Sequence, residues 1–355
     1  MVLACRAAPH LRNLRVARAA ALVHDCCCVR ITSTVLATVA LLGCGGGNQT
    51  ADEFRLITSE QPGSLLSAAV TSDGVAYLAG GVTGGGAGLL LRWDGTTLTT
   101  VPTPDAHAFW WIHRVADEEM YLAGESGEVF RFDGTTLTPL AVAAPAGTTF
   151  FGLWGASGDD LWAVGGSFTT GGPRRVIMRS VGGSWHAVDS PADVDADVTY
   201  FKVWGASASD VWIVGDRGVV LRDIGAGPVR AAAPGAERYV TVHGCGANDV
   251  YAVGGGGNGT MVHFDGAAWA PVVLGDVPLL NAVACTGGAP YIGGFFGYAA
   301  RLTGGEARVV PMPDELVDLG VHGIAIGARR IVAVGGDLLA TAANPQRGFA
   351  VEIRK

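Results

Sequence analysis

Seven hydrophobic segments of this chain end on a glycine, and these glycines recur at a nearly constant interval. They are Gly80, Gly124, Gly165, Gly215, Gly254, Gly293 and Gly335, with spacings of 44, 41, 50, 39, 39 and 42 residues. Four copies are almost superimposable: Tyr121–Gly124, Leu161–Gly165, Val211–Gly215 and Val250–Gly254. A fixed period near 40 with several short strands per unit is typical of a β-propeller. We therefore predict an all-β fold, a seven-bladed propeller with one blade per repeat.

Each repeat is consistent with four antiparallel strands, which we name A to D in chain order. Asp-Gly pairs such as Asp94-Gly95 mark turns between strands C and D. The last repeat supplies only three strands, at 321–326, 331–335 and 349–353. We expect the N-terminal strand at 54–58 to pair beside the last of them and close the ring, because closure removes a free sheet edge.

The composition excludes several classes of protein. Hydrophobic residues make up 49% and charged residues 16% of the chain, so extended disorder is not expected. The formal net charge is −8, and it becomes −12 without residues 1–43, which carry five Arg and one Asp. No basic patch with interleaved aromatic residues is present, so we expect no nucleic-acid partner.

The N-terminus has the pattern of an export signal. Basic residues up to Arg30 precede the apolar run 31–43, whose 13 residues are too few to span a bilayer. We therefore predict a signal peptide at 1–43, with Val29 as an alternative start of translation. We expect residues 44–52 to form a tether and residues 53–355 to form the propeller.

The end of this signal resembles a bacterial lipobox. In that motif, here Leu41-Leu42-Gly43-Cys44, the cysteine is lipidated and becomes the first residue. The alternative is an ordinary signal peptide with a coincidental cysteine. Lipidation of Cys44 implies a protein outside the cytoplasm, anchored to the bacterial cell envelope through its lipid. Gly45 after the cysteine favours the outer membrane.

The repeats resemble those of kelch-like propellers. A kelch unit has a hydrophobic strand ending on two glycines, followed by a spaced aromatic residue and a tryptophan. Residues 250–255 with Trp269, and residues 161–166 with Trp185, resemble this pattern, and the other repeats match loosely. The chain equally resembles secreted bacterial propeller lipoproteins with VWG-x-S-x-x-D-VW-x-VG repeats. The resemblance implies the fold, and the functions of such proteins are too varied to transfer.

Two columns of the repeat carry titratable residues. Acids before strand B face basic residues of strand C, which predicts the cross-strand pairs Glu119–Arg131, Asp160–Arg179, Asp210–Arg222 and Asp249–His263. Strand A carries His113, Trp154, Trp204 and His243, with Ala69 and Ala282 in other blades. We expect the ion pairs to be structural, and the second column to pack between blades rather than bind a metal.

An acidic loop is the candidate metal site. Asp193, Asp195 and Asp197 alternate as the first ligands of a Ca²⁺ loop do, but the later positions of that motif do not match. A solvated acidic loop is the competing interpretation. No other cofactor is predicted.

Loop aromatics are the candidate ligand-binding residues. Trp110 and Trp111 begin a strand A, and Phe295, Phe296 and Tyr298 follow a strand B. Connections B–C and D–A share one face of a propeller, so these side chains and the acidic loop are expected at one mouth. Exposed aromatics there would bind a partner, whereas the alternative is that they pad weak blades.

The two cysteines after position 44 form a candidate disulfide. Cys245 and Cys285 occupy nearly equivalent places at the ends of neighbouring strands A, offset by one residue. An oxidising compartment would permit the bond. The alternative is two buried free thiols.

No nucleophile elbow, metalloprotease motif, phosphate loop or glycosidase acid pair is present. The sequence therefore favours a lipid-anchored extracytoplasmic propeller that binds a protein or glycan partner. The alternative is a secreted carbohydrate-active hydrolase or lyase on the same scaffold.

Overall fold

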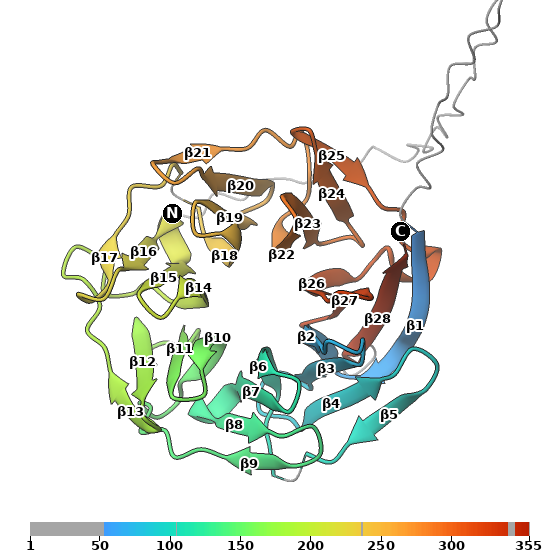
Figure 1. Cartoon of the computed structure of the whole chain (residues 1–355), viewed down its shortest axis with the longest axis horizontal. Helices are drawn as coiled ribbons and strands as arrows, with labels where there is room; N and C mark the ends of the chain where they lie inside the picture. The colour runs from blue at the N-terminus through green and yellow to red at the C-terminus, as the bar shows by residue number, and fades with distance from the viewer. Residues whose placement is uncertain (1–52, 104, 236, 340–344, 355) are drawn as a thin grey trace, which may run out of the picture. The chain divides into compact units, whose positions relative to one another are not determined.

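The described part of the chain forms a ring of seven sheets around a central axis (Figure 1). The computed structural model describes residues 53–354 except 104, 236 and 340–344. The predicted signal peptide, the alternative start at Val29, the lipidated Cys44 and the tether lie outside the described residues.

Each sheet has four antiparallel strands in the spatial order A, B, C, D. Strands A, innermost in Figure 1, are β2 (Ser64–Val70), β6 (Phe109–Ala116), β10 (Thr149–Ser157), β14 (Tyr200–Ser207), β18 (Tyr239–Gly246), β22 (Leu280–Thr286) and β26 (Gly320–Ile326). Strands B are β3 (Ala76–Gly81), β7 (Glu119–Gly124), β11 (Asp160–Gly166), β15 (Asp210–Gly215), β19 (Asp249–Gly255), β23 (Ala289–Gly294) and β27 (Ile331–Gly336).

Strands C and D form the outer half of each blade. Strands C are β4 (Gly88–Trp93), β8 (Val129–Phe132), β12 (Val176–Val181), β16 (Val220–Asp223), β20 (Gly259–Phe264), β24 (Ala299–Thr303) and β28 (Arg347–Arg354). Strands D are β5 (Leu98–Val101), β9 (Leu137–Pro139), β13 (Ser184–Ala187), β17 (Val229–Arg230), β21 (Trp269–Pro271), β25 (Glu306–Val309) and β1 (Glu53–Pro62). The short 3₁₀ turns are η1 (Glu125–Gly127), η2 (Asp216–Gly218) and η3 (Asp314–Leu316).

The N-terminal strand closes the ring, as predicted. β1 pairs antiparallel with β28, and Phe54 lies opposite Ile353. Both side chains are buried in the same hydrophobic cluster of the last blade. The seventh blade is therefore built from the two ends of the described chain.

The antiparallel order of the strands sorts the connections onto two faces. Strand A begins where strand B ends, so the B–C connections and the D–A connections between blades emerge together. We call this side the DA face, and the opposite side, with the A–B and C–D turns, the AB face.

A repeated aromatic–glycine contact sets how closely neighbouring blades approach. Trp154 of blade three packs on Gly205 of blade four, and Trp204 packs in the same way on Gly244 of blade five. A Cβ atom at Gly205 would lie 2.5 Å from the Trp154 ring. Glycine is needed at both of these positions, since only glycine leaves room for the neighbouring indole.

The four predicted cross-strand pairs are present. The shortest N–O distances are 4.0 Å for Glu119–Arg131, 2.9 Å for Asp160–Arg179, 2.8 Å for Asp210–Arg222 and 2.7 Å for Asp249–His263. The guanidinium of Arg179 also lies 4.7 Å from the ring centroid of Trp162. Arg222 lies in the same way 4.7 Å from the ring centroid of Trp212, so the pairs of blades three and four tie strands B and C together through a buried indole as well.

The register of blade six differs from the prediction. Leu280 pairs with Gly294, at the place where strand A pairs with the repeat glycine in the other blades. The repeat glycine of blade six is therefore Gly294 rather than Gly293. The strand A column shifts with it, and its member in this blade is Ala284 rather than Ala282.

Candidate functional site

Every strand A has a β-bulge next to its first paired residues, at the DA face. A bulge leaves one residue without a partner in the ladder and redirects its side chain. The residues concerned, which we call the bulge ring, are Leu66, Trp110, Phe151, Phe201, Val240, Asn281 and His322. Members from consecutive blades contact each other, as Trp110 does Phe151 and Asn281 does His322.

The bulge ring is aromatic over blades two to four. The ring centroid of Phe151 lies 4.8 Å from that of Trp110 and 5.8 Å from that of Phe201. Phe168, on the B–C connection of blade three, packs on this group. Its ring centroid lies 5.3 Å from that of Phe151 and 6.0 Å from that of Phe201. Phe168 is nevertheless 62% exposed. We call these four residues the aromatic arc.

More apolar side chains are exposed on B–C connections of the same face. Phe296 in blade six is 72% exposed and Leu339 in blade seven is 87% exposed, and Val82 and Phe295 are also exposed. Single apolar residues on a surface need no explanation, but a group on one face marks an interaction site.

Phe296 also has an unfavourable backbone conformation. Its φ is 56°, in the left-handed region that bulky residues rarely adopt. The same place in the turns η1 and η2 is taken by Ser126 and Arg217, with φ of 58° and 55°. Because the exposed Phe296 ring adds little to the core, neither folding nor burial accounts for an aromatic residue at this position.

The other four predicted aromatic residues lie in different environments. Trp110 lies in the aromatic arc and donates its indole N–H to Glu125 at 3.5 Å. Phe295 contacts the bulge ring at His322, with ring centroids 6.5 Å apart. Tyr298 instead packs into the core between blades five and six, where burial raises its pKa. Trp111 points into the axis.

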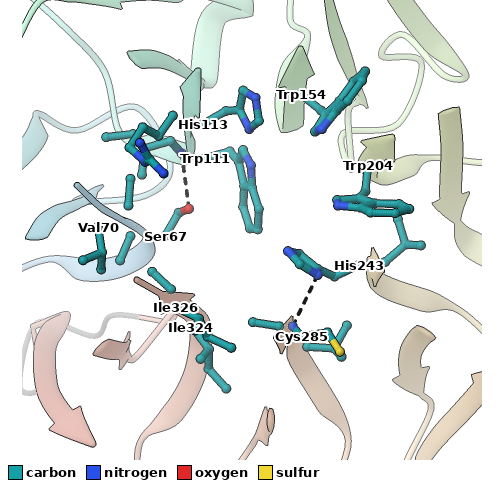
Figure 2. A pocket seen from close by; sticks show the side chains of 18 of the residues that line it. Ser67, Val70, Trp111, His113, Trp154, Trp204, His243, Cys285, Ile324 and Ile326 are labelled. Atoms are coloured by element: carbon teal, nitrogen blue, oxygen red, sulfur yellow. Dashed lines mark hydrogen bonds between the residues drawn. The ribbon is translucent and has the colours of Figure 1, made fainter. Parts of the chain in front are cut away.

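An axial cavity of about 270 Å³ lies among the strands A. Figure 2 shows that one side of the cavity is aromatic and the other is aliphatic. The aromatic side consists of Trp111, His113, Trp154, Trp204 and His243. The aliphatic side consists of Val70, Ile324 and Ile326. The strand A column explains this difference, since it holds aromatic rings in blades two to five and Ala284, Ala325 and Ala69 in the others. No Asp or Glu is among the residues that line the cavity.

The two histidines of the cavity are held by the next blade. His113 donates from Nε2 to the Gly155 carbonyl at 2.9 Å, and His243 accepts the Cys285 N–H on Nδ1 at 3.3 Å. Burial lowers the pKa of each to about 4, so both are neutral at neutral pH. They belong to the packing column, and the predicted packing role is confirmed.

Lys202 is a candidate that the sequence analysis missed. It follows the bulge residue Phe201, is 7% exposed, and burial lowers its pKa to about 7. The signal was present, because this chain has 22 arginines and only two lysines, Lys202 and Lys355. Sequence reasoning also passed over Phe151, Phe168 and Phe201, although Phe150-Phe151 and Tyr200-Phe201 are aromatic pairs at the same place in the repeat as Phe109-Trp110.

The acidic loop lies on the D–A connection between β13 and β14. Asp195 and Asp197 both accept hydrogen bonds from the Arg217 guanidinium, the first at 2.9 Å. Within the described ranges, no group of three His, Cys, Asp or Glu residues is arranged to hold a metal ion. In this structure one arginine pairs with two of the three carboxylates, and the Ca²⁺ site suggested by Asp193, Asp195 and Asp197 stays a prediction.

The Cα atoms of Cys245 and Cys285 lie 5.0 Å apart, within the range of a disulfide. Cys285 pairs with Pro290 in the ladder, whereas Cys245 lies in a bulge between Gly244 and Gly246. Cys245 and Cys285 each lie nine residues before the repeat glycine of their blade once Gly294 is taken for blade six, so the one-residue offset came from counting back from Gly293. The geometry supports the bond, which stays a prediction until thiols are counted.

Comparisons with known proteins agree on the fold. Neither a protein-family model nor a curated protein matches the sequence. Among solved structures, the chain is similar to YCF48 bound to a D1 peptide, with 14% identity, a TM-score of 0.53, and coverage of 66% of this chain and 77% of that one. The WD40 repeats of RRP9 have 12% identity, a TM-score of 0.64, and coverage of 85% and 98%.

An extracellular domain is also among the similar structures. That of BT4673 from B. thetaiotaomicron has 12% identity, a TM-score of 0.60, and coverage of 84% of this chain and 39% of that one. At such identities the likeness shows the seven-bladed propeller fold, and the kelch-like resemblance stays a prediction. Over residues 53–354, apart from the gaps named above, no helix is long and apolar enough to cross a membrane.

Proposed function

We propose that this protein is a lipid-anchored, extracytoplasmic propeller that binds a protein partner through its DA face. The exposed aromatic surface carries this proposal, since Phe168, Phe296 and Leu339 project from B–C connections of one face. Aromatic anchors of this kind dominate the energetics of protein interfaces. Among the similar structures, YCF48 is bound to a D1 peptide, which supports a protein partner.

A protein partner fits these side chains better than the glycan that the sequence also allowed. The exposed group consists of Phe, Leu and Val side chains, which offer no hydrogen bonds to sugar hydroxyls. The alternative of a carbohydrate-active hydrolase or lyase gains no support, because no carboxylate lines the axial cavity.

The proposed location rests on Cys44 and on the cysteine pair. Lipidation at Cys44 would tether the propeller to the cell envelope, and Gly45 favours the outer membrane. The short distance between Cys245 and Cys285 supports an oxidising compartment, where disulfides persist.

A pull-down from solubilised envelopes tests the binding surface. The double variant Phe168→Ser/Phe296→Asn removes two exposed rings, and Ile224→Ser removes an equally exposed apolar side chain from a C–D connection on the AB face. We expect one partner to be retained by the wild type and by Ile224→Ser but lost by the double variant, with purified components reproducing the difference. Equal retention by all three proteins would contradict the proposal.

The anchor is tested separately by Cys44→Ser. We expect this variant to lose membrane association, because stable anchoring requires the attached lipid chains. Fractionation followed by mass spectrometry of the N-terminus checks both location and processing. A variant that remains in the membrane fraction and is processed as before would exclude lipidation.

A further inference from the structure

Lys202 is a buried cation in strand A of blade four, next to the bulge residue Phe201. Lys202 donates from Nζ to the Phe151 carbonyl at 2.5 Å, and its ammonium lies 4.5 Å from the ring centroid of Trp111. Its side chain thus reaches from blade four back to blades three and two. A buried ammonium normally has an anionic partner, because desolvation of an isolated charge is costly.

Lys202 has no such partner among the described residues. Its hydrogen bond goes to a neutral carbonyl, and no ion pair involves it. Burial alone accounts for the lowered pKa of Lys202, with no carboxylate raising it again. His322 senses this charge: burial is the main cause of its lowered pKa, and the Lys202 ammonium lowers it further.

The surroundings of Lys202 are polar on one side and aromatic on the other. In blades five to seven, the side chains of Thr241, Asn281 and His322 are buried, and the Thr241 hydroxyl donates to the Asn281 backbone carbonyl. His322 donates from Nε2 to the Gly336 carbonyl at 2.9 Å, which leaves Nδ1 to accept from the Asn281 amide at 3.4 Å. The aromatic arc occupies blades two to four.

We propose that the axis at the DA face receives the C-terminus of a partner chain, with its terminal carboxylate on Lys202 and an apolar last side chain on the aromatic arc. This rests on the proposed function, and it names which part of the partner is bound. The carboxylate supplies the missing negative charge, and charge-assisted hydrogen bonds are about twice as strong as neutral ones. A chain end carries a carboxylate and an apolar side chain on one residue, and Lys202 lies directly beside Phe151 and Phe201 of the aromatic arc.

The two lysines of the chain provide a direct measurement. Protein labelled with ¹³C-lysine gives one side-chain signal from Lys202 and one from Lys355, and Lys202→Met identifies the first. N-acetyl-L-phenylalanine carries a carboxylate beside an aromatic ring, and its C-terminal amide has the same shape without the charge. We expect the acid to shift the Lys202 signal and to raise its titration midpoint by about one pH unit or more. Equal effects of acid and amide, or no effect of the acid, would overturn the proposal.

The partner identified by the pull-down gives the second measurement. We expect amidation of its C-terminus to weaken binding to the wild type by about tenfold or more. Lys202→Met should bind the free and the amidated forms with equal, weak affinity. If the double variant Phe168→Ser/Phe296→Asn loses the partner but amidation has no effect, the carboxylate site is refuted and the binding face stands. If N-acetyl-L-phenylalanine binds at Lys202 but the double variant keeps the partner, the binding face is refuted and the carboxylate site stands.

Discussion

Single positions in strands A decide how closely the blades of this protein approach one another. Gly205 lies under the Trp154 ring, where a Cβ atom has no room, whereas a Cβ atom at Gly246, near the end of strand A in blade five, would meet nothing within 4 Å. We expect Gly205→Ala to lower the free energy of unfolding by about 1–3 kcal/mol, because overpacking displaces the indole. Gly246→Ala should change it by less than about 0.5 kcal/mol. Chemical denaturation of both variants checks this, and equal stabilities would show that the contact is loose.

Lys202 should make stability depend on pH. Its pKa is about 7 in the folded protein and about 10.5 in the unfolded chain, so between these values the unfolded state binds the extra proton. Stability should therefore fall as pH decreases from about 10.5 to 7 and stay at the lower level below pH 7. Lys202→Met should stabilise the protein most at pH 7 and below, and this gain should shrink toward pH 10.5. Thermal unfolding across this range measures the difference, and a gain independent of pH would contradict the buried charge.

At the scale of elements, the strands were predictable and the bulges were not. Strand order follows from repeated apolar segments and turn residues, which are local signals. A bulge depends on which residues lie opposite each other in the two strands, and a local sequence pattern does not predict this pairing. Trp110 and Trp111 are neighbours in the sequence, yet the bulge sends Trp110 to the aromatic arc and leaves Trp111 in the axial cavity. The sequence therefore indicated both tryptophans as candidates but could not predict that they lie in different sites.

Burial rules explain why Lys202 was missed. Sequence reasoning expects lysine at the surface, and a lysine that breaks this rule becomes visible only once the strand is placed on the axis. The same limit applies to Phe168, since its loop position is plain in the sequence but its contacts with Phe151 and Phe201 are not.

A covalent link between strands β18 and β22 is the prediction at this scale. A bond between Cys245 and Cys285 closes a loop of 40 residues, which would stabilise the protein by about 3–4 kcal/mol if it is unstrained. We expect unfolded, unreduced protein that lacks residues 1–44 to have no free thiol, and reduction to lower its thermal stability. Two reactive thiols per chain would reject the bond.

At the scale of the whole molecule, stability depends on the strand that joins the two ends of the described chain. Deletion of residues 53–62 removes β1, which exposes an edge on β28 and the cluster around Phe54. We expect a cooperative loss of several kcal/mol that affects all blades. Deletion of the tether residues 45–52 is the matched control and should leave the melting temperature unchanged. A β1 deletion that melts like the wild type would show that the seventh blade is stable with three strands.

The strand A column is aromatic in some blades and alanine in others, and this difference limits how many orientations a ligand on the propeller axis can adopt. A channel with seven identical walls would offer a ligand seven equivalent rotational settings, an entropic advantage of RT ln 7, or about 1.1 kcal/mol. Here the rings of Trp154 and Trp204 face Ala69 and Ala325 across the axis, so the settings differ in energy. A ligand on this axis therefore lacks the entropic advantage of seven equivalent orientations. A ligand on the axis should therefore bind in one azimuthal orientation, although the backbone around it repeats seven times.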